Sequence, residues 1–472
     1  MLALVLLAMW PAFSIPFGII DDHDIIDIIG PRQRLPLWQV PHELFVRTNE
    51  PLGRFRPVYW LGHVLECAVA GPDPVLWWVD RSVLATICVV AVFSALRLFL
   101  PVTWSVAVSF LVLCGAQFET FRRLGPNEAY AMPLACIAVA LLVRGIRRGL
   151  PPGRLWPVYV CAVLAAGAKE NFVPFAGLVV LASVCCTGLA RMRRADWAVV
   201  LTTSTLLAAD LAMILVKLAE HGSQYPQPRT PYTTVSWAVF ADSTLDEGGR
   251  LNLCLALLVF VLILHRRRLD RGLAWWLTLV AANSLLQVLF YAGGPTAGRY
   301  LYPLALAAVV LWAAVVVLVR RLANPWARVV MLALIGVALG LSVVGGIWNA
   351  RVTEAAVAQQ NRHFSERLSG LERMIVRRNV NTVVLQPQEP LTDQERVFSL
   401  ARYIHADIGV PVMTLPATQG SGAFSNSLGS TLEDWSREGS GRLVPYRPTS
   451  DCVSVVFGDA EPVCSLHVPA PG

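Results

Sequence analysis

Long apolar runs separated by short polar connections fill the chain up to residue 348. Runs this continuous must face lipid rather than water, and about twenty apolar residues cross a bilayer. The pattern predicts an all-α polytopic membrane bundle of about eleven transmembrane helices, some of them shorter than this length. The predicted spans are Leu2–Ile20, Val75–Leu96, Val102–Phe118, Ala129–Val143, Leu155–Ala168, Phe172–Leu189, Trp197–Leu218, Leu251–Leu264, Leu273–Ala292, Tyr300–Val319 and Val329–Trp348.

The composition changes after Trp348. The remaining chain carries charges, Gly/Ser stretches and two strand-like runs, Thr382–Leu385 and Val453–Phe457, with helical spacing over Asp393–His405 between them. We therefore predict two parts. Residues 1–348 form a transmembrane module with a long first outer loop at 21–74, and residues 349–472 form a small extracytoplasmic α/β domain.

Composition agrees with the membrane prediction, because 55% of the residues are hydrophobic and only 15% are charged. The net charge of +7 comes largely from arginine clusters that fall at alternate turns. Such clusters mark the cytoplasmic side, so we interpret the charge as a topology signal and not as a nucleic-acid surface. This predicts a multi-pass protein of the inner (plasma) membrane, with a cytoplasmic N-terminus and an extracytoplasmic C-terminal domain. The clusters contain Arg97, Arg144, Arg147, Arg148, Arg154, Arg191, Arg193, Arg194, Arg266, Arg267, Arg268, Arg320, Arg321 and Arg328.

Most of the ten cysteines lie in apolar runs, where cysteine behaves as a small hydrophobic residue. Their spacing matches no metal site, so no metal and no cofactor are predicted, although a divalent cation is left open. Cys452 and Cys464 lie in the predicted outer domain and flank a short strand-turn segment. Oxidising conditions there would allow them to form a disulfide.

An acidic cluster, Asp21–Asp22–His23–Asp24, follows the first predicted span directly. One interpretation is a solvated acidic loop. The other is a general base, because like-charge neighbours and the negative end of a helix both favour a proton-accepting carboxylate.

Cationic residues gather on the same predicted side, although positive charge there runs against the orientation bias. Arginine can bind phosphate oxygens with two hydrogen bonds, and these residues can therefore hold a phosphate-bearing ligand. Interfacial snorkelling and mutual neutralisation within a Lys–Glu pair are the alternatives. The candidate substrate-binding residues are Asp24, Arg54, Arg56, Arg122, Arg123, Glu128, Lys169, Glu170, Arg299 and Tyr300.

The order of these short motifs along residues 2–348 resembles that of the bacterial GT-C superfamily of integral-membrane glycosyltransferases. The motifs are an acidic pair (Asp21, Asp22), the segments Gly53–Pro57 and Gly125–Glu128, a Lys169–Glu170 pair and Arg299–Tyr300. The resemblance implies a polyprenyl-phosphate sugar donor and a function in the cell envelope. It also implies that Asp21 or Asp22 is the base, and that the phosphate contacts are Arg54, Arg56, Lys169 and Arg299.

Two other classes of protein remain as alternatives. A transporter or lipid flippase would often show internal repeats and midplane charges. Asp210, Asn283 and Gln287 lie within predicted spans, where they either line a polar cavity or join helices. A non-catalytic scaffold would leave the acidic pair unexplained. The acceptor can be a glycan, a lipid or a protein, and the sequence identifies neither it nor the sugar.

Overall fold

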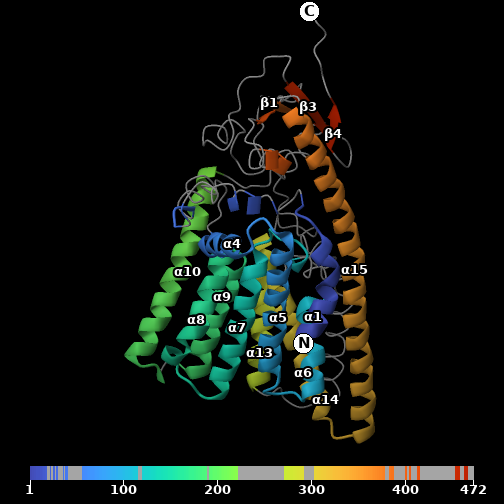
Figure 1. Cartoon of the computed structure of the whole chain (residues 1–472). Helices are drawn as coiled ribbons and strands as arrows, with labels where there is room; N and C mark the ends of the chain where they lie inside the picture. The colour runs from blue at the N-terminus through green and yellow to red at the C-terminus, as the bar shows by residue number, and fades with distance from the viewer. Residues whose placement is uncertain are drawn as a thin grey trace, which may run out of the picture.

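The computed structural model shows a bundle of roughly aligned helices with a small sheet beyond one end of it (Figure 1). The longest helix, α15 (Pro325–Arg377), runs along the bundle and continues to the sheet. The structure describes residues 1–18, 22, 25–26, 28–29, 36, 38–40, 56–114, 120–188, 191–221, 271–291, 302–377, 382–386, 399–400, 403–404, 412–414, 452–457 and 462–465.

Apolar helices build the bundle, and their bounds follow the predicted spans closely over most of the described part. Its core contains large buried aromatic side chains such as Trp77, Trp312 and Phe172. The helices besides α15 are α1 (Leu2–Met9) with η1 (Trp10–Ser14), α4 (Pro57–Ala70), α5 (Pro74–Leu96), α6 (Val102–Ser109) with η2 (Phe110–Leu113), α7 (Glu128–Arg147), η4 (Pro152–Leu155) with α8 (Trp156–Ala168), α9 (Phe172–Thr187), α10 (Arg194–His221), α13 (Arg271–Tyr291) and α14 (Tyr302–Arg320).

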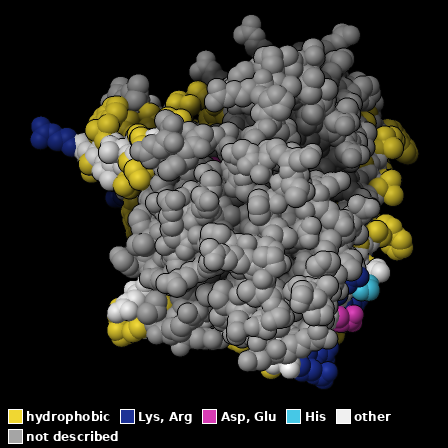
Figure 2. Space-filling view, turned by 90° about the horizontal axis from the view of Figure 1, so that it is seen from above, with side chains coloured by type: hydrophobic (Ala, Val, Ile, Leu, Met, Phe, Trp, Pro, Cys, Tyr) yellow, Lys and Arg dark blue, Asp and Glu magenta, His cyan; other side chains and the backbone are white. Residues whose placement is uncertain are grey.

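Four stretches of described helix are long and apolar enough to cross a membrane, in α5, α7, α10 and the first part of α15. Large apolar side chains point outward from them, with Leu201 58% exposed and Leu341 69% exposed. Hydrophobic side chains also appear around the rim of the molecule when it is viewed from above (Figure 2). A surface of this kind needs a lipid solvent. The chain is a multi-pass membrane protein, while the number of eleven spans remains a prediction.

Local sequence sets the ends of the helices. The Asp73 carboxylate accepts a hydrogen bond from the Val75 backbone N–H at 2.9 Å, which caps the start of α5. At the opposite end of the bundle, Gly149 adopts a φ of 64° in the turn after α7, a conformation that suits glycine. The Asp196 carboxylate accepts from the N–H groups of Gly153 and Arg193, so it joins the start of α10 to the turn before α8. The turns after α5, α7, α9 and α14 lie at this end (Figure 1).

Three of the differences from the predicted boundaries lie near the end of the bundle that is closest to the sheet (Figure 1). The first helical segment ends at Ser14 rather than Ile20, and residues 15–18 continue without helix. The predicted first outer loop contains a helix, α4, which begins with Pro57 at its first turn. α15 does not end with its apolar part at Trp348 but continues unbroken to Arg377. The predicted span Leu251–Leu264 lies outside the described residues.

Four strands follow α15 and form one sheet in the order β2-β1-β3-β4. The predicted runs correspond to β1 (Thr382–Gln386) and β3 (Cys452–Phe457), which are parallel, while β2 (Val412–Thr414) and β4 (Pro462–Ser465) were not predicted. Most of Asp393–His405 lies outside the described residues. A separately folded domain over 349–472 remains a prediction.

The strand register bears on the predicted disulfide. β4 runs antiparallel to β3 and places Cys464 opposite Val455, three residues along β3 from Cys452. Because bonded cysteines need Cα atoms closer than about 7 Å, a bridge would require a different register here. The Cys452–Cys464 disulfide stays a prediction that this register does not favour.

Candidate functional site

Asp22 is the described member of the acidic cluster, and it is 3% exposed. One carboxylate oxygen accepts the Gly18 N–H at 2.7 Å. The other accepts the N–H groups of Leu124 and Gly125 at 3.1 and 3.0 Å. A carboxylate with three backbone donors is held firmly in place. Asp22 therefore joins the segment after the first helix to the segment that precedes α7.

That second segment, residues 120–128, is also bound through its carbonyl groups. Arg81 of α5 donates to the Leu124 carbonyl at 2.9 Å, and Tyr59 of α4 donates to the Gly125 carbonyl at 3.0 Å. Both backbone polar groups of Leu124 and of Gly125 therefore have partners, which fixes the backbone next to Arg122 and Arg123.

Arg81 belongs to a buried polar cluster that sequence reasoning did not single out. The Glu66 carboxylate accepts from Arg81 through both oxygens at 3.1 Å, and from the hydroxyl of Tyr130. Burial acts to raise the pKa of Glu66, but the charge of Arg81 outweighs it and holds the pKa well below its usual range. His63 contacts Glu66 at 3.0 Å. The available signal was the adjacent pair Asp80–Arg81 inside an apolar run.

Two predicted cations lie in a second group of ion pairs, between α4 and the turn that joins α8 to α9. Arg56 donates two hydrogen bonds of 2.7 Å to Glu170. Lys169 lies 3.1 Å from a carboxylate oxygen of Glu128 and 3.7 Å from Glu170. The predicted Lys169–Glu170 pair is therefore present, and it belongs to a larger group in which Arg56 and Glu128 also take part.

Inside the bundle, Gln287 of α13 donates to the Asn171 carbonyl at 2.8 Å, so a predicted intramembrane polar residue contacts the same turn.

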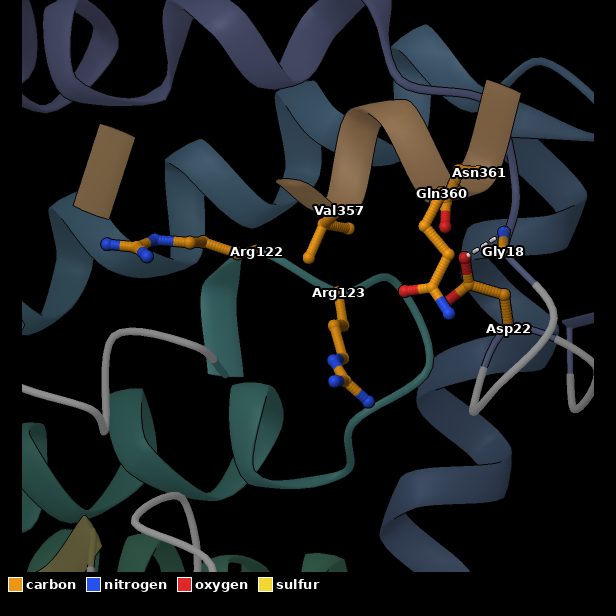
Figure 3. A pocket seen from close by; sticks show the side chains of 7 residues that line it. All are labelled: Gly18, Asp22, Arg122, Arg123, Val357, Gln360 and Asn361. Carbon is orange, nitrogen blue, oxygen red and sulfur yellow. Dashed lines mark hydrogen bonds between the residues drawn. The ribbon is translucent and has the colours of Figure 1, made fainter. Parts of the chain in front are cut away.

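Arg122 and Arg123 lie on the other side of the site, against the part of α15 beyond Trp348. With Gly18, Asp22, Val357, Gln360 and Asn361 they line a small pocket of about 30 Å³. Figure 3 shows that the Arg122 side chain points away from Gln360 and Asp22. It lies 3.8 Å from Glu354, a fully buried carboxyl. Burial raises the pKa of Glu354 to about 7, while Arg122 and Arg351 act in the opposite direction.

The segment before the acidic cluster is bound by residues from the end of the chain. Asn361 of α15 donates to the Pro16 carbonyl at 3.0 Å, and Tyr403 donates to the Gly18 carbonyl at 2.7 Å. A Cβ on Gly18 would lie 2.7 Å from the Asn361 side chain, so glycine permits this close approach. The C-terminal part of the chain therefore helps to shape the site.

Five of the predicted site residues lie outside the described residues: Asp21, Asp24, Arg54, Arg299 and Tyr300. Within the described ranges, no group of three or more His, Cys, Asp or Glu side chains is arranged to hold a metal ion.

The helical bundle and its long final helix define the class of protein as a polytopic membrane protein. The structure is similar to the crystal structure of ArnT from Cupriavidus metallidurans bound to undecaprenyl phosphate, with a TM-score of 0.58 and 12% sequence identity. The match covers 97% of this chain and 92% of that one, and it confirms a polytopic helical fold like that of ArnT. No protein-family model and no curated protein matches the sequence.

Proposed function

We propose that this protein is a membrane glycosyltransferase that transfers a sugar from a polyprenyl-phosphate donor to a hydroxyl of a glycan, lipid or protein. The observation that carries the proposal is the position of Asp22. It ties the acidic segment to the arginine-bearing segment 120–128, within a fold shared with a protein crystallised with undecaprenyl phosphate. An acid beside cations suits a reaction in which a hydroxyl attacks and a phosphate leaves.

The roles of the two aspartates follow from the contacts of Asp22. Because its oxygens already accept three backbone N–H groups, Asp22 is suited to positioning. We therefore assign the general base to Asp21. Its carboxylate would take the proton of the acceptor hydroxyl as the new bond to the anomeric carbon forms. The bond from that carbon to the phosphate oxygen breaks, and its electrons remain on the phosphate.

The leaving phosphate needs positive charge, which Arg54, Arg56, Lys169 and Arg299 would supply. Arg56 and Lys169 are paired with Glu170 and Glu128, so these carboxylates position the two cations. Arg54 and Arg299 would then supply the positive charge that offsets the charge of the leaving phosphate. The remaining predicted ligand contacts, Asp24, Arg122, Arg123 and Tyr300, would bind the sugar or the acceptor.

The proposed location is the inner membrane, with the site facing the extracytoplasmic side, where sugar transfer would serve the cell envelope. The decisive experiment incubates membranes containing the protein with a panel of radiolabelled polyprenyl-phosphate sugars. Label should pass from one donor to a new product and remain on the donor with Asp21→Asn. If no donor is used, yet the protein moves such lipids across vesicle membranes, it is a flippase instead.

A further inference from the structure

Arginine side chains gather at the end of the bundle opposite the sheet, where the turns after α7 and α9 lie (Figure 1). Asp196 joins these two turns, because its carboxylate accepts the Gly153 N–H at 2.6 Å and the Arg193 N–H at 2.8 Å. A Cβ on Gly153 would lie 2.8 Å from this carboxylate, so glycine permits the contact. The two turns therefore present one basic surface, which we call the basic end. Its exposed arginines are Arg144, Arg147, Arg148, Arg154, Arg191, Arg193 and Arg194.

The positive charge of the basic end has no acidic partner in the described part of the chain. The acidic side chain of these turns, Asp196, is 3% exposed, and both of its oxygens accept backbone N–H groups. Among the described residues, none of the seven arginines forms an ion pair. Arg147 donates instead to the Leu98 carbonyl, and its guanidinium carbon lies 5.6 Å from the centroid of the Phe99 ring. Like charges at one surface repel one another unless a counter-charge lies beside them.

Exposed tryptophans place the basic end at the surface of the membrane. Trp326 and Trp348 are 79% and 68% exposed and lie at the two ends of the apolar part of α15. They are roughly 33 Å apart along the helix, which matches a hydrocarbon core of about 30 Å. Trp156 begins α8 and Trp197 lies in the first turn of α10, and both are exposed beside the arginines. Because tryptophan collects at membrane–water interfaces, the basic end lies at the depth of the lipid headgroups.

We propose that the basic end binds the phosphate headgroups of anionic phospholipids in the leaflet that it faces. A signal that only orients the chain acts through the charge of each loop and needs no contact between two turns. Here a buried carboxylate joins two turns that carry arginine, and lipid phosphates are the counter-charge available at this depth. Guanidinium groups bind phosphate oxygens through paired hydrogen bonds. The inference goes beyond the proposed function, because it applies equally to a transferase and to a flippase.

The test uses the full-length protein reconstituted in phosphatidylcholine bilayers that contain a trace of spin-labelled lipid, either phosphatidylglycerol or phosphatidylcholine. EPR spectroscopy separates the lipid immobilised by the protein from the bulk lipid, and it therefore gives the relative association of the two headgroups. Phosphatidylglycerol should associate about fivefold more strongly, as one basic residue beside an anionic headgroup would give. This preference should decrease as salt is added, because exposed charges are screened.

A double variant examines the two turns together. Arg148→Gln with Arg193→Gln removes one charge from each turn and leaves the other arginines of the basic end to orient the chain. It should lower the preference for phosphatidylglycerol to about twofold or less. Arg362→Gln with Arg373→Gln is the matched control, because it removes the same charge from exposed positions of α15 beyond Trp348. The control should keep the wild-type preference.

Three results would overturn the proposal. The first is equal association of the two lipids with the wild-type protein at low salt, which would leave the basic end with orientation as its only role. The second is a preference that salt does not change. The third is an equal loss of preference in the double variant and in its control, which would show that the net charge of the protein attracts the lipid. If the double variant does not fold, Arg148→Gln alone takes its place, with Arg362→Gln as its control.

Discussion

The hydroxyl of Tyr403 donates a hydrogen bond of 2.7 Å to the carbonyl oxygen of Gly18, which precedes it by 385 residues. Gly18 in turn donates its N–H to Asp22. One short path of contacts therefore connects the region after α15 to the candidate catalytic segment. The ring of Tyr403 packs edge-on against Phe364 of α15 with centroids 5.2 Å apart, so its direction is set by the long helix.

Tyr403→Phe should keep this ring packing and remove only the hydrogen bond. We expect a loss of about 1 kcal/mol in stability and a severalfold lower transfer rate, because Gly18 and Asp22 become less well positioned. Thermal midpoint and transfer rate are measured together. Tyr159→Phe is the control, since it removes a buried hydroxyl contact to Ser183 elsewhere in the bundle. Equal losses of rate in both variants would mean that the Tyr403 contact has no special effect on the site.

Substitution of the two aspartates should give different results. Asp21→Asn should leave folding and donor binding intact while lowering transfer by about 10² or more, since it removes the proposed base. Asp22→Asn replaces an acceptor-only group with an amide whose NH₂ would face backbone donors. It should lower both the thermal midpoint and transfer. The assignment of Asp21 fails if Asp21→Asn transfers at a near wild-type rate.

How far the sequence predicts the fold depends on the length of each apolar run. The predicted span Val75–Leu96 agrees with the observed α5 to within one residue, because Pro74 and Arg97 mark the two ends of a long apolar run. α4 was missed, since its 14 residues are too few to span a membrane and lie in a polar loop. The continuation of α15 was missed because its polar residues suggested a new domain at Trp348.

The sequence predicts candidate site residues by type but not their pairing. Spacing and topology place acids and cations on one predicted side of the membrane. The partners could not be predicted, since Arg56 and Glu170 are 114 residues apart and Asp22 binds backbone groups that carry no sequence signal. Glu354 and Tyr403 belong to the part of the chain that was assigned to a separate domain.

Arg56→Lys should weaken undecaprenyl phosphate binding about tenfold, although it keeps the positive charge. The guanidinium makes two hydrogen bonds to Glu170, and an ammonium group cannot reproduce this planar geometry. Glu170→Gln should have a similar effect, because it weakens the contact that orients Arg56. Donor affinity is measured on the purified variants. Arg148→Lys, exposed at the opposite end of the bundle, is the control. Loss of binding in all three would point to damaged folding.

Glu354 should make stability depend on pH. Its pKa is raised to about 7 by burial, against an ordinary value of 4.5 that applies to the unfolded chain. Between these values the folded protein holds a proton that the unfolded chain has released, so the free energy of unfolding falls as pH rises from 4.5 to 7. The decrease in the free energy of unfolding is at most about 3 kcal/mol, and it is complete above pH 7.

Glu354→Gln removes this titration. Its thermal midpoint, measured from about pH 5 to pH 8, should therefore fall less steeply with pH than that of the wild type. The exposed Glu366→Gln on the same helix should retain the wild-type slope. Parallel curves for all three proteins would show that Glu354 is ionised in the folded state throughout, and that its contact with Arg122 outweighs the cost of burial.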